Sequence, residues 1–326
     1  MLEAGRVIKI VKTVCSSLDL NLNGLNVLTE VGSNSYSILP VIAAFAGAKV
    51  FAWTRDSSYG KAVDNISQCR ELLECFGLVD KVEFYIGELN KEHLQEADII
   101  TNSGFLRPLN AEKLKHAKPG LIIPLMYEEW EFRASEIDLE YCKINDIRVA
   151  GTWEGHPSIN VFSYVGVLAI KMALNGGFEV KDNNIFIWSK DEFGLEAQKA
   201  FKDMKANELT MSTNKAELKD KLPSLDFIFV CDYEEKQNLQ KVLDFEAIKK
   251  INPSCGIIHL YGEIDSNSLS KSGLHFYPVR LGKAQKMSFT LSEVGLNPIV
   301  RLQAAGLKVA ESLKHGKSSS LVQTII

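Results

Sequence analysis

The chain has 326 residues, of which 46% are hydrophobic and 24% charged, and its formal net charge is −4. This length suggests two domains of ordinary size, each able to bury a core. The slightly acidic balance argues against a nucleic-acid partner, which would select a basic surface. No apolar run of about 20 residues predicts a membrane span, and no signal-peptide pattern opens the chain. The six cysteines form no C-x-x-C pair, which is typical of reduced thiols in a cytoplasmic protein.

The first half of the chain alternates helices with short apolar strands. An amphipathic helix over 4–18 precedes the segment from Asn26 to Asp56, which predicts a strand, a tight turn, a helix and a second strand. Further strands are expected at 82–86, 98–102, 121–125 and 148–150, with helices at 59–76, 91–96, 110–116 and 137–145. Because strands that alternate with helices form parallel sheets, we expect a doubly wound α/β domain over residues 1–150.

The turn after the first of these strands is a candidate nucleotide site. Gly32 permits a sharp turn, Ser33 and Asn34 follow it, and the free N–H groups of the next helix favour an anion there. The second strand ends at Arg55 and Asp56, where such folds place a carboxylate for a ribose or an Arg for a 2′-phosphate. A local ion pair between these two is the alternative. The other glycines of G-x-G-x-x-G are absent, so a purely structural turn also remains open.

Two polar stretches follow later strands of this half. Asn102 and Ser103 could contact a ligand at the carboxyl edge of the sheet, or could cap the next segment. YEEWEFR, residues 127–133, reads either as a connecting loop or as the wall of a cleft. Its glutamates have no His partner at ligand spacing, so no metal site is predicted.

A second alternating unit follows the loop GTWEGHPSINVF, residues 151–162, and a long apolar helix that ends at Leu174. Strands are expected at 185–188, 208–211, 227–231, 256–260 and 275–279, with helices at 192–204, 215–221 and 234–251. The fold class is therefore α/β, with two doubly wound parallel-sheet (Rossmann-like) domains joined by a crossing helix. The second domain covers 151–297. The tail after Leu313 contains Gly and three serines, which is typical of a mobile end.

One long segment resembles a known family. EIDLEYCKINDIRVAGTWEGHPSINVFSYVGVLAIKMAL, residues 136–174, is similar to the interdomain crossing segment of D-isomer-specific 2-hydroxyacid dehydrogenases. FEAIKKINPSCGIIHLYGEID, residues 245–265, resembles the family's strand with a catalytic Arg, and Tyr261 stands at the Arg position. The resemblance implies NAD(P)-linked redox chemistry between the domains and a C-terminal helix, 298–326, that returns to the first domain. The family's Gly-rich turn corresponds to WSKDEFG, residues 188–194, which has a single Gly, and its Pro-His to Ser288-Phe289.

The first domain also resembles class I methyltransferases. EVGSNSY, residues 30–36, matches the place of their acid-x-Gly loop. Residues 68–89 look like their second helix and third strand, and DIITNSG, residues 98–104, like their fourth-strand motif. This resemblance implies S-adenosylmethionine as an alternative cofactor.

Two histidines are candidates for proton transfer. His156 lies in the polar loop before the crossing helix, two residues from Glu154, and an imidazole oriented by a carboxylate suits general acid–base work near neutral pH. A His that only bonds the loop is the alternative. His259 ends a buried strand beside Tyr261, at an edge where ligands bind, although a satisfied core His fits the same position.

The sequence thus predicts an NAD(P)-dependent oxidoreductase related to 2-hydroxyacid dehydrogenases. Its substrate would be a small polar or carboxylated metabolite, and its cofactor NAD or NADP. A methyltransferase-like protein and a non-catalytic relative that keeps the scaffold are the alternatives, since both glycine fingerprints are incomplete. The apolar helix over 161–174 suggests a homodimer, and no metal, nucleic-acid or membrane partner is expected.

Overall fold

The computed structural model describes residues 4–233, 243–282 and 286–326. The chain divides into two compact units, each with its own parallel sheet. Unit 1 comprises Met1–Val161 and Gly295–Ile326, and unit 2 comprises Phe162–Val294. The expected fold class, two Rossmann-like parallel-sheet domains, is confirmed. The loop at 151–161 belongs to unit 1, so unit 2 begins directly before the crossing helix and eleven residues later than the sequence suggested.

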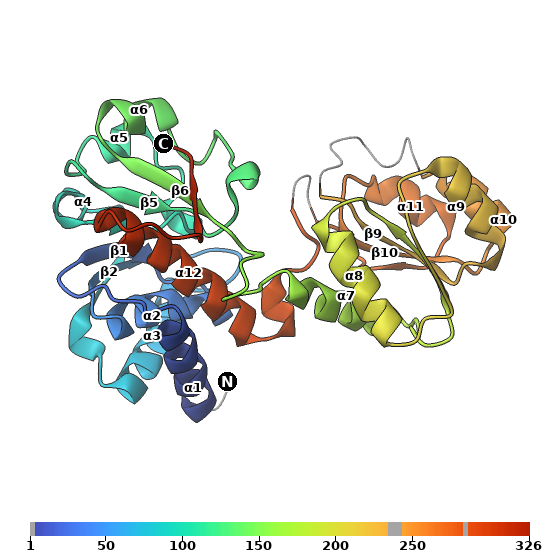
Figure 1. Ribbon diagram of the computed structural model, residues 1–326, viewed down its shortest axis with the longest axis horizontal. Coiled ribbons are helices and arrows are strands. Elements are labelled where there is room, and N and C mark those ends of the chain that lie inside the picture. Colours follow the sequence, from blue (N-terminus) through green and yellow to red (C-terminus); the bar gives the residue numbers. More distant parts are fainter. Residues whose placement is uncertain (1–3, 234–242, 283–285) are drawn as a thin grey trace. The chain divides into compact units, whose positions relative to one another are not determined.

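The sheet of unit 1 has the order β3-β2-β1-β4-β5-β6, extended by β12 (Figure 1). The first six strands are parallel and β12 is antiparallel to β6. The strands are β1 (Asn26–Glu30), β2 (Lys49–Thr54), β3 (Val82–Ile86), β4 (Ile99–Ile100), β5 (Ile122–Pro124), β6 (Arg148–Thr152) and β12 (Val322–Thr324). The switch in strand order lies between β1 and β4, and ligands of open α/β sheets bind at the carboxyl edge beside such a point.

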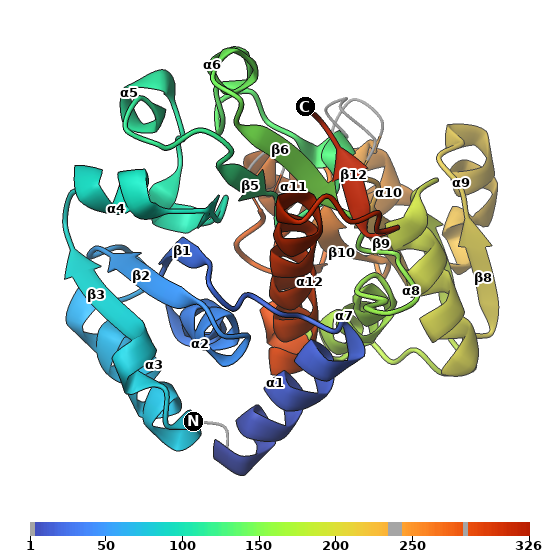
Figure 2. The ribbon, with the colours of Figure 1, turned by 60° about the vertical axis from the view of Figure 1, so that its left-hand side comes forward.

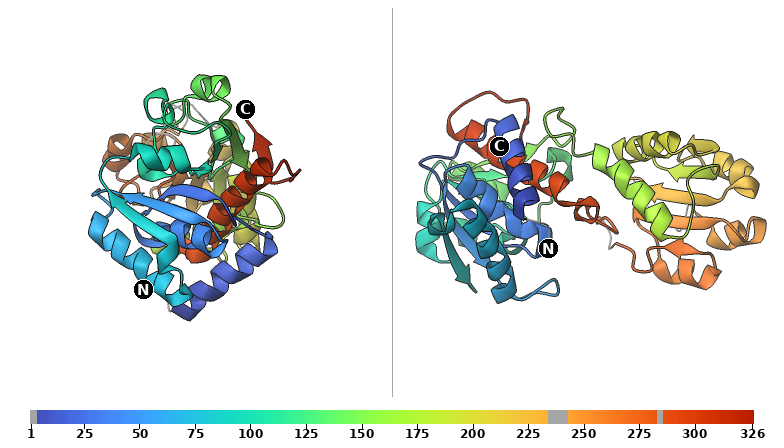
Figure 3. Two further views of the ribbon diagram at one scale, coloured as in Figure 1. Left: turned by 90° about the vertical axis from the view of Figure 1, so that its left-hand side faces the viewer. Right: turned by 90° about the horizontal axis from the view of Figure 1, so that it is seen from below.

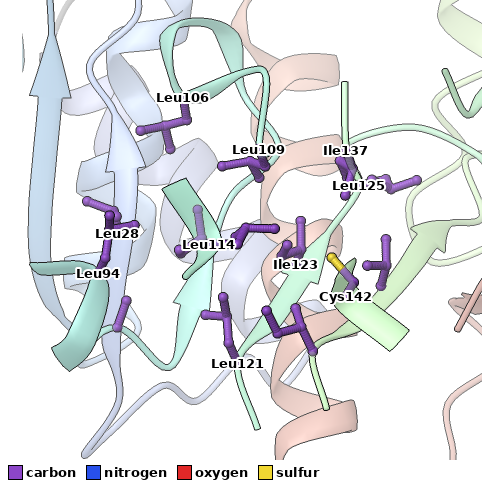
Figure 4. Close-up of a cluster of buried hydrophobic side chains, with 14 of the residues drawn as sticks. Leu28, Leu94, Leu106, Leu109, Leu114, Leu121, Ile123, Leu125, Ile137 and Cys142 are labelled. Carbon is purple, nitrogen blue, oxygen red and sulfur yellow. The ribbon is translucent and has the colours of Figure 1, made fainter. Parts of the chain in front are cut away.

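Helices cover both faces of this sheet (Figure 2). One face carries α1 (Ala4–Ser17), α2 (Leu39–Phe45), α3 (Ala62–Phe76) and α12 (Leu296–Lys314). The other carries α4 (Lys91–Glu96), α5 (Ala111–Leu114) and α6 (Leu139–Ile144). Between these last helices and the sheet lies a core of large aliphatic side chains, in which Leu28, Ile100 and Ile123 of the strands meet Leu94, Leu114 and Cys142 of the helices (Figure 4). Burial of such side chains is the main stabilising contribution to the unit.

The C-terminal segment completes unit 1. α12 packs on α1, α2, β5 and β6, and Gly306 passes so close to Met126 that a Cβ there would overlap its sulfur. Glu311 is 2% exposed, accepts the Asn21 N–H at 2.9 Å and pairs with Lys308 at 2.9 Å. The tail that the sequence suggested to be mobile forms β12 instead, because the edge of β6 offers it backbone partners.

Unit 2 has its own sheet with helices packed against it (Figure 3). The sheet has five parallel strands in the order β8-β7-β9-β10-β11. Its strands are β7 (Asn184–Trp188), β8 (Glu208–Met211), β9 (Phe227–Cys231), β10 (Gly256–Tyr261) and β11 (Phe276–Tyr277). α7 (Ser163–Asn175) and α8 (Glu192–Asp203) cover one face, and α9 (Lys215–Lys221), α10 (Phe245–Ile251) and α11 (Ser266–Ser272) the other. The helix expected at 234–251 is described only from residue 243 onwards, and its first part lies outside the described residues.

Local sequence explains where most of these helices start. In the described ranges, an Asn or Asp side chain accepts a backbone N–H of the first turn at the N-terminus of seven helices, which removes an unsatisfied donor at each. The residues are Asn90, Asn110, Asp138, Asp191, Asn214, Asp244 and Asp265. The helix expected between the first two strands starts without such a cap, and the chain there forms a 3-10 turn (η1, Asn34–Ile38) before α2.

Candidate functional site

A pocket of about 490 Å³ opens at the carboxyl edge of the unit 1 sheet. Its walls come from the end of β2, the loop after β3, the 3-10 turn η3 (Gly104–Leu106) and α5 with the residues that follow it. Trp53, Thr54 and Arg55 line it from β2, and Phe105 lines it from η3. A pocket at this edge is in the place where sheets of this type bind nucleotides.

Cations dominate one wall of this pocket. Arg55, Lys91, Lys113 and Lys115 line it, against Glu88 and Glu112. The Arg55 guanidinium lies over the Phe105 ring, with 5.2 Å between Cζ and the ring centroid. Lys113 donates to the Leu106 carbonyl at 3.0 Å, and burial together with the nearby Arg55 lowers the pKa of its ammonium. A bound anion would relieve the repulsion between these two side chains.

A stack of aromatic rings includes Trp53, which lines the pocket from β2. The rings of Trp53 and Tyr85 stack with centroids 5.2 Å apart, and His93 packs on Tyr85 and on Phe51 at 4.1 and 4.5 Å. His93 is 7% exposed, and burial lowers its pKa. The stack fixes the β2–β3 wall of the pocket, because planar rings packed on three sides have little rotamer freedom.

The Gly32 turn that was predicted to bind a nucleotide is organised by packing. A Cβ on Gly32 would lie 2.6 Å from the Cβ of Tyr36, so this position needs glycine because η1 folds back over it. Ser33 Oγ is buried, and Asn34 adopts a φ of 54°. Asn34 lines a separate pocket of about 340 Å³ between α1, α3 and α12, away from the carboxyl edge of β2. The turn residues therefore do not meet Arg55 in one site.

The Glu30 side chain, at the end of β1, lies against the loop that follows β4. Its carboxylate accepts the Phe105 N–H at 2.8 Å, and a Cβ on Gly104 would overlap it. Burial raises the pKa of Glu30, opposed by the Phe105 N–H and by Arg107 and Arg55. An acid at the switch point disfavours a phosphate there and moves any anionic ligand toward the β2 side, where the cations are.

Asp56, predicted to bind a ribose, faces α3 instead. Its carboxylate accepts the Ala62 N–H at 2.9 Å and pairs with Lys61 at 2.8 Å. It does not line the pocket, whereas its neighbour Arg55 does. The ion pair offered as the alternative, between Arg55 and Asp56, is replaced by one between Lys61 and Asp56.

Asn102 and Ser103 belong to internal hydrogen-bond networks. Asn102 is 2% exposed and donates from Nδ2 to the Tyr127 hydroxyl at 2.8 Å, and that hydroxyl donates to Glu136 at 2.6 Å. Glu136 also accepts from Arg107 at 2.6 Å; burial acts to raise its pKa, but these partners outweigh that effect and lower it. Ser103 Oγ bonds to Thr101 Oγ1 at 2.8 Å. Neither side chain forms the cap that was offered as an alternative; both fix the loops after β4 and β5.

The structure does not join His156 to Glu154. The imidazole Nδ1 contacts Ser158 Oγ at 2.7 Å and Nε2 contacts Ser320 Oγ at 2.8 Å, so both ring nitrogens are engaged by hydroxyls. Glu154 is 9% exposed, and burial, with Glu131 and Glu128 nearby, raises its pKa well above the usual range. The predicted orientation of the imidazole by this carboxylate is therefore wrong, because serines take that role.

His259 and Tyr261 lie in packed surroundings within unit 2. His259 is 1% exposed, donates from Nε2 to the Gly262 carbonyl at 2.7 Å, and its Nδ1 lies 2.8 Å from Ser288 Oγ. Burial lowers its pKa to about 4. Tyr261 is 5% exposed, and its ring stacks on Tyr233 at 4.0 Å. Both nitrogens bond to segments that follow β10 and β11, so these contacts favour the alternative, a satisfied core histidine, over a catalytic role.

Three further features bear on the chemistry. Among the described residues, no group of three or more His, Cys, Asp or Glu side chains is arranged to hold a metal ion. None of the helices in the described ranges combines the length and apolar character that a membrane span needs. All six cysteines are free thiols, and five are buried.

Comparison with known proteins yields structural matches only. No protein-family model matches the chain, and no curated protein matches it by sequence. Similar solved structures include a dipicolinate synthase subunit from Bacillus halodurans (TM-score 0.56, 12% identity, 90% of this chain and 97% of that chain). Others are an NAD-dependent formate dehydrogenase from Staphylococcus aureus in complex with NAD (0.55, 11%, 93% and 98%) and D-lactate dehydrogenase from Escherichia coli (0.53, 12%, 93% and 100%).

These matches confirm the two-domain fold that the resemblance to 2-hydroxyacid dehydrogenases implied. At 11–12% identity they show the fold alone. The methyltransferase alternative receives no support from them. The pocket residues Phe105 and Lys113 were not anticipated from the sequence. The available signal was the lysine-rich run EKLKHAK, residues 112–118, in the segment that connects two strands of the sheet.

Proposed function

We propose that this protein is an NAD(P)-linked oxidoreductase acting on a small polar or carboxylated metabolite, and that the unit 1 pocket holds the phosphorylated adenosine end of NADP(H). The observation that carries the proposal is that two cationic side chains, Arg55 and Lys113, lie near each other in the lining of a pocket at the carboxyl edge of β2. An Arg at this strand end suits a 2′-phosphate. The Arg55–Phe105 stack offers a planar surface beside it.

Binding of NADPH provides the test. Replacement of Arg55 or Lys113 with Ala is expected to weaken NADPH binding by about 10- to 100-fold, because each loses a charge-assisted contact to phosphate. The loss should be smaller for NADH, and wild-type affinity should fall as salt increases. Isothermal titration calorimetry measures all of these.

Arg70→Ala is the matched control. Arg70 is an exposed arginine on α3 that also lies over a phenylalanine ring, Phe84, at 5.4 Å, but it is outside the pocket. Equal losses in Arg70→Ala and Arg55→Ala would contradict the site. Binding of S-adenosylmethionine by the wild type, with no binding of NADPH, would overturn the proposed cofactor.

His156 is the proposed proton donor or acceptor of the reaction. The Ser158 N–H and hydroxyl hold Nδ1, and the Ser320 hydroxyl, which can donate or accept, faces Nε2, so the proton would be exchanged at Nε2. His156→Ala is expected to lower turnover about 100-fold once a substrate is identified, the lower end of the usual range for acid–base groups. Ser158→Ala should change turnover much less. Unchanged turnover in His156→Ala would remove this residue from the mechanism.

A further inference from the structure

In unit 2, a carboxylate of the chain itself, that of Asp191, occupies the turn between strand β7 and helix α8. Between β7 and α8, Asp191 accepts the N–H groups of Phe193 at 2.9 Å and Gly194 at 3.3 Å through Oδ1, and the Ser189 hydroxyl donates to the same oxygen at 3.0 Å. α8 has 12 residues, and the first N–H groups of a helix after such a strand are the donors that dinucleotide-binding sheets offer to a phosphate. In this chain those donors are already used.

The Asp191 carboxylate also contacts both sides of the switch point, the place where the strand order of the sheet reverses. Asp191 Oδ2 accepts the backbone N–H of Tyr233, which follows β9, the neighbour of β7 in the sheet. β8 and β7 lie on one side of this point, and β9, β10 and β11 on the other. One side chain therefore bridges the crevice in which open α/β sheets place their ligand.

Aromatic rings occupy the edge beside Asp191. The ring of Phe193 stacks on Tyr233 with centroids 5.0 Å apart, and Tyr233 stacks on Tyr261 at 4.0 Å. Phe193 is 7% and Tyr261 5% exposed. Gly194 is still needed, because a Cβ there would lie 2.5 Å from the Ser189 side chain. The turn thus keeps the close helix–strand packing of a dinucleotide site while its ligand space is filled by protein.

We propose that Asp191 is an internal substitute for a ligand phosphate, and that unit 2 consequently takes up no dinucleotide. A phosphate at this turn would face the Asp191 carboxylate and the stacked rings of Phe193 and Tyr233, and would find the N–H groups of Phe193 and Gly194 already bonded. Any nucleotide that the protein binds is expected in unit 1. Unit 2 is expected to have a structural role and to hold no nucleotide.

Chemical rescue tests this proposal. In Asp191→Gly, hydrogen exchange of a peptide covering residues 189–197 is expected to become at least about 10-fold faster, since the amides lose their acceptor. Addition of about 10 mM sodium pyrophosphate should restore protection of this peptide in the variant, because the anion takes the place of the carboxylate, and leave the wild type unchanged. Sodium chloride at equal ionic strength should have no such effect.

Asp244→Gly is the matched control, because Asp244 caps α10 of the same unit by accepting the Ala247 N–H at 3.0 Å. Its loss should not be rescued by pyrophosphate. If Asp191→Gly does not fold, the same measurement is made on Asp191→Ala, which also removes the acceptor and fits the extended backbone of this position (φ −108°) at a lower entropic cost than glycine. Absence of selective rescue in the folded variant overturns the proposal.

Dinucleotide binding in unit 2 of the wild type overturns it as well. Such binding would appear as protection of the 189–197 peptide by NADH or NADPH that persists in Arg55→Ala. This outcome is distinct from failure of the unit 1 pocket, which would appear as absence of NADPH binding with the pyrophosphate rescue intact.

Discussion

Phe201→Ala is expected to lower the free energy of unfolding of unit 2 by about 3–5 kcal/mol, the usual cost of truncating a fully buried phenylalanine. Phe201 lies on α8, is 0% exposed, and meets Phe227 and Phe229 of β9 edge-on with centroids 5.9 and 5.5 Å apart. Removal of the ring leaves a cavity between helix and sheet that the rigid strands cannot fill. Urea unfolding, followed by hydrogen exchange of β9 peptides, measures the loss within unit 2.

Leu195→Ala on the same helix is the control. Leu195 is 41% exposed, so its truncation should change the unfolding free energy by less than about 1 kcal/mol. A similar loss in both variants would mean that helix propensity, and not the packing of the ring, determines the stability of this unit.

Acid should destabilise unit 2 through His259. Its pKa is about 4 in the folded protein, against an ordinary value of about 6.5, because burial disfavours the imidazolium. Between these values the unfolded chain binds the proton and the folded chain does not, so stability is full above about pH 6.5 and falls as the pH is lowered toward 4. The difference amounts to about 3 kcal/mol.

Comparison with His259→Gln isolates this contribution. Gln can donate to the Gly262 carbonyl and accept from Ser288, yet it does not titrate. The wild type should lose about 3 kcal/mol more than the variant between about pH 7 and 4, measured by urea unfolding of unit 2. Equal losses would show that carboxylates cause the whole acid effect and that the imidazole is protonated without cost.

The sequence predicted the two sheets because both depend on local patterns. Short apolar runs rich in aromatic and β-branched residues, such as Phe227–Cys231, favour buried strands, and Asn or Asp residues mark where helices start. β12 escaped prediction because Val322–Thr324 has no alternating pattern of its own and becomes a strand only against β6. Its formation depends on a partner far away in the chain, which local patterns do not reveal.

The candidate site was predicted less well than the fold. Arg55 was identified from its place at the end of β2, but Phe105 and Lys113 reach it from other elements, and only the folded sheet brings the three together. The sequence offered both His156, in a polar loop, and His259, at the end of an apolar strand, as candidates for proton transfer. Their difference is one of burial, since His156 is partly exposed and His259 is 1% exposed. WSKDEFG contains two acids, Asp191 and Glu192. Asp191 stands directly before α8, where an Asp side chain commonly caps the helix.

The discontinuity of unit 1 constrains how the protein can be made. α12 supplies the packing of α1, α2, β5 and β6, yet the ribosome finishes it only after the whole of unit 2 has been translated. Domains generally fold as units during synthesis, so unit 2 can form from one continuous stretch while the earlier strands of unit 1 still lack their last helix. The nascent first half therefore exposes the apolar side chains that α12 later covers, and this interval is when binding by a chaperone matters most for this chain.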